Sequence, residues 1–394
     1  MTLMNFDNVT NRQGTDCLKY DAAVRRNKPA DVLPFWVADM DFPTAPCILN
    51  ALHARIDHGI FGYSEADPDR FYNVLKKWFQ TRHHWTIQKN WIIQTPGIVF
   101  ALAMTVRAYS KPGDSILIQQ PVYYPFSEVI QDNNRNVVNS PLILKNGSYK
   151  IDFDDFEKKI IENNVKLFLL CNPHNPGGRV WTKEELIQMG DICLSHHVCI
   201  AADEIHQDFV WPNHIHTVFA SLGEIYEQNT IICTSPSKTF NLAGLQLSNI
   251  FIPNPILRRK FKKEITKTGY SQLNTLGLVA GEAAYREGAP WLDELKIYLY
   301  DNITYTQNFL QQNLPQIGFI CPEGTYLVWL DFRALGLTEA QREDILLNQA
   351  GLWLDSGAMF GPDGEGFERL NIACPRTILK TALEKLCVLQ HITN

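Results

Sequence analysis

The chain has no long apolar run, no excess of basic charge and no pattern of paired cysteines. No hydrophobic stretch approaches the roughly 20 residues that cross a bilayer, so no membrane span is expected. The polar N-terminal residues lack the basic-then-apolar order of a signal peptide. With a formal net charge of −6, nothing favours binding to nucleic acid or to an anionic membrane.

Cysteine and histidine spacing gives little support for disulfides or metals. The nine cysteines include no CxxC pair, which argues against a disulfide framework and a zinc knuckle. We therefore expect free thiols in a reducing cytoplasm. Several histidines are paired, but HExxH spacing is missing, so no metal site is predicted. The paired histidines are His83 with His84, His196 with His197, and His214 with His216.

Length and composition indicate a soluble globular protein of two domains. A chain of 394 residues is longer than one hydrophobic core usually grows, and 45% hydrophobic with 20% charged residues is ordinary. Short apolar runs alternate with amphipathic stretches from about residue 50 to about 285, which is typical of a largely parallel α/β sheet. We assign 50–285 to a large domain, and 1–49 with 286–394 to a smaller one. Residues 1–49 look irregular.

Individual elements are predicted from local patterns. A capping box at Thr182–Glu185 opens a helix, and the basic run after Pro255 is interpreted as a solvated helix face. After residue 324 the pattern changes to an α+β unit, in which a helix follows Thr338 and another follows Pro375. The predicted strands are 114–124, 165–173, 198–204, 230–237, 248–253, 325–332, 352–361 and 368–374.

Lys238 follows one predicted strand and Asp203 ends another. A lysine amine can form a Schiff base when part of it is neutral, which burial promotes, and the hydroxyls of Ser235 and Ser237 could bond a phosphate. A solvated loop lysine is the alternative. A buried acid such as Asp203 needs a partner, and a protonated pyridine nitrogen would supply one. Its alternative is an ordinary helix N-cap.

Further candidates follow other predicted strands. Tyr123 offers a flat face for stacking on a ring, and Asn175 could donate to a phenolic oxygen. Aromatic packing and turn chemistry are the respective alternatives. Gly97 precedes a helix, so backbone N–H groups there could bind an anion. Arg369 suits a substrate carboxylate, or else a surface salt bridge with Glu368 or another acid. Because ligands bind at the carboxyl edge of an open α/β sheet, the residues that follow the strands could converge there.

Taken together, these segments resemble fold-type-I pyridoxal-phosphate enzymes of the class I/II aminotransferase superfamily. Within it, the chain is similar to the MalY/PatB type of cystathionine β-lyase, a C–S lyase, over almost its whole length. The segments that carry the likeness are 12–15 with 19–21, 35–42, 62–65 and 203–206. The resemblance implies a large domain with a mostly parallel seven-stranded sheet, plus a smaller α+β domain.

The resemblance also implies a role for each site residue. Lys238 resembles the lysine that holds the cofactor and moves the Cα proton, and Arg369 the arginine that binds the α-carboxylate. Tyr63 is similar to a tyrosine that reaches the phosphate in the neighbouring subunit, which implies a homodimer with shared active sites. The other residues would surround the ring, the phosphate or the substrate. They are Asp203 at the pyridinium, Tyr123 stacking, Asn175 and His206 near the phenolic oxygen, Gly97, Ile98, Ser235 and Ser237 at the phosphate, and Trp36 and Ala38 bordering the substrate.

The implied reaction is α,β-elimination of L-cystathionine or related cysteine S-conjugates to a thiol, pyruvate and ammonia. An aminotransferase on the same scaffold would share every residue named here, because the two reactions differ only after deprotonation. A third possibility is a regulatory role, in which the protein binds a transcription regulator. That role is compatible with catalysis.

Overall fold

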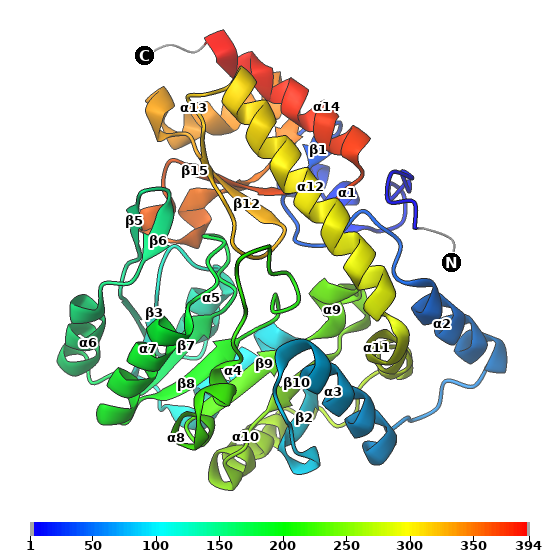
Figure 1. Ribbon diagram of the computed structural model, residues 1–394, viewed down its shortest axis with the longest axis vertical. Coiled ribbons are helices and arrows are strands. Elements are labelled where there is room, and N and C mark those ends of the chain that lie inside the picture. Colours follow the sequence, from blue (N-terminus) through cyan, green and yellow to red (C-terminus); the bar gives the residue numbers. More distant parts are fainter. Residues whose placement is uncertain (1–3, 392–394) are drawn as a thin grey trace.

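The computed structural model describes residues 4–391 and is built around a seven-stranded sheet (Figure 1). Only β10 runs against its neighbours, so the sheet is mostly parallel, as predicted. In spatial order the strands are β2 (Ile92–Thr95), β10 (Ser248–Phe251), β9 (Thr230–Thr234), β8 (Cys199–Asp203), β7 (Leu167–Cys171), β3 (Ser115–Ile118) and β4 (Asn136–Asn139).

Helices cover both faces of this sheet, which explains its uniformly apolar central strands. Every residue of β7 is buried, and its side chains alternate between two hydrophobic cores. One core lies under α4 (Ile98–Tyr109), α5 (Pro125–Gln131) and α10 (Pro255–Lys267). The other lies under α3 (Pro68–His83), α6 (Phe153–Glu162) and α7 (Lys183–Ser195). The remaining elements of this region are β5 (Ile143–Lys145), β6 (Ser148–Lys150), α8 (Glu224–Glu227), α9 (Pro236–Thr239) and α11 (Thr275–Glu287).

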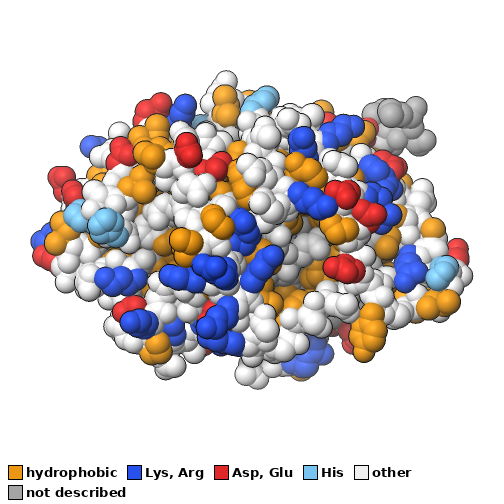
Figure 2. All heavy atoms as spheres, turned by 90° about the horizontal axis from the view of Figure 1, so that it is seen from below, with side chains coloured by type: hydrophobic (Ala, Val, Ile, Leu, Met, Phe, Trp, Pro, Cys, Tyr) orange, Lys and Arg blue, Asp and Glu red, His pale blue; other side chains and the backbone are white. Residues whose placement is uncertain are grey.

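Two of the predicted local features of this part are confirmed. Thr182 and Glu185 form the reciprocal capping box that begins α7. The basic helix α10 buries Phe261 and exposes most of its lysines and arginines, as expected of a solvated face. Figure 2 shows many Lys and Arg side chains gathered on the lower side of the molecule, the end where α10 lies in Figure 1.

A second, four-stranded sheet lies beside the first and is entirely antiparallel. Its strands, in order, are β11 (Gly318–Ile320), β12 (Leu327–Asp331), β15 (Phe367–Asn371) and β14 (Asp355–Ser356). The long helix α12 (Ala289–Asn313) packs against α14 (Arg376–Leu386), and α13 (Glu339–Asp344) continues into a π-helical turn. This part is therefore an α+β unit, as the sequence predicts.

Several predictions about chain conformation are wrong. The strand predicted over 114–124 ends at Ile118, and the one predicted over 230–237 ends at Thr234, because Pro236 begins α9. The strand expected over 352–361 ends at Ser356, and Gly357–Phe360 is a short 3₁₀ helix, because the chain turns there against the loop at Gly364. The N-terminal segment, expected to be irregular over residues 1–49, contains regular elements. Residues from Pro46 form α2 (Pro46–His58), since a proline suits the first turn of a helix. The preceding residues include α1 (Leu18–Asp21) and β1 (Leu33–Pro34), which pairs with β13 (Leu352–Trp353).

Within residues 4–391, no helix is long and apolar enough to cross a membrane. The same residues contain no group of three or more potential metal ligands. All nine cysteines are free thiols.

Candidate active site

A cavity of about 400 Å³ lies at the carboxyl ends of β7, β8 and β9. These strands are adjacent and parallel to one another and to β3, so the segments that follow all four reach the same edge of the sheet. The structure thereby brings together most of the residues singled out from the sequence. Those that line the cavity are Ala38, Gly97, Ile98, Tyr123, Asn175, Asp203, His206, Ser235, Ser237 and Lys238.

Lys238 is the one lysine or arginine among the residues that line this cavity. It lies on the short helix α9 and is half-buried rather than solvated, and its Nζ donates a hydrogen bond to the carbonyl of Ala38 at 2.9 Å. Burial lowers the pKa of Lys238 to about 8. Behind it, Thr239 Oγ1 donates to buried Asp208 at 2.7 Å, which anchors α9. The amine is thus positioned and partly neutral near physiological pH.

Asp203 is the last residue of β8 and is buried beneath the cavity. No helix begins after it, so it is not the helix N-cap of the alternative interpretation. Its Oδ1 accepts a hydrogen bond from the Ile205 N–H at 3.1 Å. Burial raises the pKa of Asp203 to about 7, against the opposing effects of that hydrogen bond and of Lys238. A buried carboxyl group of this kind is well suited to a cationic partner in the cavity.

Asn175 is oriented by Arg369. The guanidinium Nη1 of Arg369 donates to Asn175 Oδ1 at 3.1 Å, which directs the amide Nδ2 elsewhere. That Nδ2 has no hydrogen-bond partner among residues 4–391, and buried His206 Nδ1 has none either. Burial lowers the pKa of His206 well below its usual value, so this imidazole is neutral. Unpaired polar groups beside a cavity are suited to a ligand's polar atoms.

Arg369 does not itself line the cavity, and it is not the surface residue of the alternative interpretation. It is buried on β15 and pairs with buried Asp355, and its Nη2 also donates to the Trp36 carbonyl at 2.8 Å. The neighbouring Glu368 pairs instead with Arg342 at 2.6 Å. Within the part of the chain that the structure describes, the Nε of Arg369 is buried without a partner. A fixed guanidinium with an unused donor remains available for a carboxylate.

The turn into α4 supplies backbone donors at one end of the cavity. Gly97 is the N-cap of α4 and Ile98 its first residue, and the first N–H groups of a helix have no partner within it. Ser235 gives its one hydroxyl proton to the Leu247 carbonyl at 2.6 Å, so the Ser237 hydroxyl, 2.9 Å away, donates to Ser235 Oγ and lies beside the cavity. Helix dipole, backbone donors and hydroxyls together suit a phosphate.

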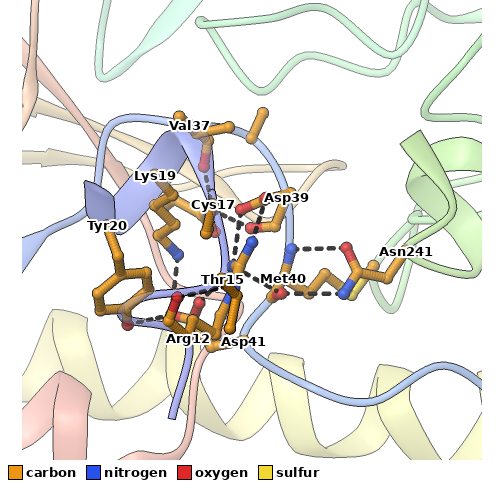
Figure 3. Close-up of polar contacts among 12 residues, drawn as sticks. Arg12, Thr15, Cys17, Lys19, Tyr20, Val37, Asp39, Met40, Asp41 and Asn241 are labelled. Carbon is orange, nitrogen blue, oxygen red and sulfur yellow. Dashed lines mark hydrogen bonds and ion pairs between the residues drawn. The ribbon is translucent and has the colours of Figure 1, made fainter. Parts of the chain in front are cut away.

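The N-terminal segment that carries Ala38 is held against the site by buried charges (Figure 3). Arg12 binds the carboxylates of Asp39, at 2.6 Å, and Asp41, at 2.7 Å. Fully buried Lys19 donates to the other oxygen of Asp41 at 2.8 Å. On the far side, Asn241, three residues after Lys238, exchanges hydrogen bonds with the backbone of Met40. This network of Arg12, Lys19, Asp39 and Asp41, which we call the N-terminal charge cluster, fixes Ala38 opposite Lys238.

Tyr63 lies away from the catalytic cavity within this chain. Its side chain is 99% exposed, on the segment between α2 and α3. It lines a separate hollow with Phe61 and Gln246, and only Gln246 also reaches the catalytic cavity.

Sequence reasoning missed several residues around the site. Asp355 lies in an apolar stretch of sequence. An acid in such a stretch is expected to be buried and paired with a cation, and this signal could have identified it. Tyr326 donates to the Ala38 carbonyl at 2.9 Å, but its run is indistinguishable in sequence from an ordinary core strand. Tyr124 follows Tyr123, with ring centroids 5.3 Å apart.

The residues present match the needs of pyridoxal phosphate. An aldehyde would meet the partly neutral Lys238, a cationic ring nitrogen the buried Asp203, and a phenolate the free Nδ2 of Asn175. A phosphate would meet the start of α4, where no arginine lines the cavity, so helix N–H groups and hydroxyls would carry the binding.

Comparisons with known proteins agree with this arrangement. A family model described as aminotransferase class I and II matches residues 30–386. Cystathionine beta-lyase PatB of Bacillus subtilis is 43% identical over 97% of this chain and 99% of its own length. A PLP-bound putative aminotransferase from Clostridium difficile superimposes with a TM-score of 0.96 at 41% identity, covering 98% of this chain and all of its own. A PLP-bound C–S lyase from Staphylococcus hominis gives a TM-score of 0.92 at 35% identity, covering 98% of both chains.

Proposed function

Because the chain belongs to the class I and II aminotransferase family, we propose that it is a pyridoxal-phosphate-dependent carbon–sulfur β-lyase. Its substrates are L-cystathionine and related cysteine S-conjugates, and its products are a thiol, pyruvate and ammonia. The observation that carries the proposal is the joint position of Lys238 and Asp203 in one buried cavity, with Arg369 one hydrogen bond away through Asn175. The relatives described as lyases support the reaction type.

Bound pyridoxal phosphate supplies an electron sink for negative charge that develops at the substrate Cα. Asp203 would maintain that sink by forming an ion pair with the protonated ring nitrogen. The pair would stabilise both the buried carboxylate and the proton on the ring. Asn175 would donate to the phenolic oxygen through the Nδ2 that its bond with Arg369 leaves free. Tyr123 would cover the ring, and the start of α4 with Ser237 would hold the phosphate.

Lys238 carries out the proton transfer. With pyridoxal phosphate bound, the Nζ of Lys238 would accept the Cα proton of the substrate, because burial keeps part of this amine neutral. Arg369 binds the α-carboxylate and fixes the Cα–H bond toward Lys238. The electron pair from that bond then expels the thiolate from Cβ. Hydrolysis of the remaining three-carbon fragment gives pyruvate and ammonia, and the thiolate takes up a proton.

The alternative function is an aminotransferase that uses the same residues. The similar structure from Clostridium difficile, described as a putative aminotransferase, is the observation that favours it. The test is incubation of the purified holoenzyme with L-cystathionine, with separate assays of pyruvate and free thiol. A lyase releases both in equal amounts without a keto acid acceptor. Amino-group transfer that requires a keto acid and releases no thiol would contradict the lyase assignment.

The active form is a homodimer in which each active site uses Tyr63 of the other subunit. Exposed apolar side chains near Tyr63, among them Ile56, Ile60 and Phe61, support an interface at this segment. The test mixes Tyr63→Ala with Lys238→Ala subunits, each inactive alone. Random reassembly places one intact site in half of the dimers, so about 25% of wild-type activity should return. No recovery after demonstrated subunit exchange would refute shared sites.

The protein works in a reducing cytoplasm, a location compatible with nine free thiols. A docking role for a transcription regulator stays a prediction from the resemblance alone. Such a role would survive Lys238→Ala, because docking on the outside of the protein does not use the catalytic amine.

A further inference from the structure

A second cavity, of about 340 Å³, lies on the far side of Arg369 from the catalytic cavity. We call it the distal cavity. Its size is within the range of about 300–1,000 Å³ that small-molecule sites occupy. The residues that line it come from the N-terminal segment and from the region of the small sheet. They are Arg26, Lys28, Trp36, Tyr124, Glu339, Glu343, Leu346, Leu347, Leu352, Trp353, Leu354, Asp355, Ser356, Met359 and Glu368.

The two cavities share a wall. Tyr123 lines the catalytic cavity and Tyr124 the distal one, and their rings are in contact. Arg369 bridges the same wall, because it donates to Asn175 on one side and to Asp355 on the other. A thioether substrate whose α-carboxylate lies at Arg369 would therefore have the distal cavity next to it. The group beyond the sulfur atom is the part of that substrate for which no binding residues have yet been named.

The distal cavity is apolar in its middle and charged at its rim. Trp36 and Trp353 stack with ring centroids 4.3 Å apart, and the Arg26 guanidinium lies over Trp36 at 4.8 Å. Lys28, at the same rim, pairs with Glu343. The acidic lining residues are likewise occupied, Glu339 by Ser356, Glu368 by Arg342 and Asp355 by Arg369.

Arg26 is the exception at this rim. Among residues 4–391 no carboxylate pairs with it, so its donors are free. It is close enough to influence its surroundings: burial raises the pKa of Asp355, and the charge of Arg26, after that of Arg369, opposes the rise. Stacking on Trp36 restricts the plane of the guanidinium, and a restricted guanidinium is a good receptor for a carboxylate.

We propose that Arg26 binds an anionic group at the far end of the substrate's sulfur substituent, such as the carboxylate of the homocysteine half of L-cystathionine. The distal cavity would thereby select thioethers with an acidic end over neutral ones of equal length. This inference rests on the proposed lyase function, but it concerns substrate preference and not the bond-breaking step.

The test compares two substrates in wild type, Arg26→Gln and a control variant. L-cystathionine carries the distal carboxylate, whereas S-butyl-L-cysteine has a neutral chain of similar length. In Arg26→Gln, we expect kcat/KM for L-cystathionine to fall about tenfold, which corresponds to about 1.4 kcal/mol, while S-butyl-L-cysteine is unaffected. The loss should be in KM with kcat retained, because Arg26 is remote from the reacting bonds. Lys28→Gln, which removes a paired charge from the same rim, should leave the substrate ratio unchanged.

A binding measurement separates this inference from the lyase function. The carba analogue of L-cystathionine, with a methylene in place of sulfur, has no leaving group at Cβ, so its affinity for the holoenzyme can be measured by calorimetry without elimination. Arg26→Gln should weaken it about tenfold and Arg26→Lys by less. If both thioethers lose efficiency equally, or if the analogue binds wild type and Arg26→Gln alike, the inference is wrong. Wild-type enzyme that binds the analogue through Arg26 but releases no thiol would overturn only the lyase function.

Discussion

Replacing Asp41 by asparagine should destabilise the protein strongly, because it leaves a buried cation without its partner. Lys19 is fully buried, and its Nζ is 2.8 Å from Asp41 Oδ2. The same carboxylate also binds Arg12 at 2.7 Å. Breaking a buried ion pair by removing one partner costs about 3–5 kcal/mol. The Asp41→Asn variant should lose this amount of unfolding free energy.

The reciprocal change should cost less. Lys19→Met removes the cation but leaves Asp41 paired with Arg12, so no buried charge is abandoned, and we expect a loss of about 1–2 kcal/mol. In the Lys19→Met background, Asp41→Asn should then cost less than in wild type, with a coupling of about 2 kcal/mol. Urea unfolding midpoints of the four proteins, followed by fluorescence and circular dichroism, measure this cycle.

Additive losses of unfolding free energy in Asp41→Asn and Lys19→Met would contradict a buried ion pair between the two residues. If Asp41→Asn costs the same with and without Lys19, or less than Lys19→Met alone, the N-terminal charge cluster does not hold a desolvated charge. If the cluster were solvent-exposed, each single substitution would lower the unfolding free energy by less than about 1 kcal/mol, and added salt would reduce that loss strongly.

Three further predictions concern the catalytic cavity. Asp203→Asn should lower kcat by about 10²–10³-fold, yet stabilise the cofactor-free protein at pH 8, because the buried carboxylate, with its pKa raised to about 7, is ionised there without a cationic partner. Thermal unfolding and turnover check the two parts. Arg369→Lys should lower kcat/KM about 10–100-fold, since lysine has no equivalent of the unpartnered Nε that is available to the carboxylate. The rate at which the cofactor-free protein binds pyridoxal phosphate should rise about tenfold per pH unit up to the pKa of Lys238, about 8, and stay constant above it, because only the neutral amine attacks. Stopped-flow absorbance measures this rate, and a rate that does not change with pH would contradict the prediction.

The strands and the edge at which ligands bind could be predicted from the sequence. The runs that became β7, β8 and β9 are apolar because helices cover both faces of the sheet, and parallel neighbours must deliver Asn175, Asp203 and Lys238 to the same edge. Local order was sufficient there, because each residue lies within a few positions of its strand end.

Contacts between distant segments could not be predicted in the same way. The sequence gives no register between β15 and β14, so it does not reveal that Arg369 meets Asp355, and a surface partner such as Glu368 was equally plausible. Arg26 lies more than 300 positions from the tryptophan that stacks on Trp36, and only the folded chain assembles that rim. The domain limits, the roles of the site residues and the contribution of Tyr63 to a second subunit remain predictions.

The proposed function requires the covalent attachment of pyridoxal phosphate to one amine. The decisive measurement is borohydride treatment of the cofactor-saturated protein, followed by peptide mass spectrometry. We expect the near-visible absorbance to disappear and one reduced adduct to lie on Lys238, with none in Lys238→Ala. A fixed adduct on another lysine, or none on the peptide that contains Lys238, would contradict the assignment of this site.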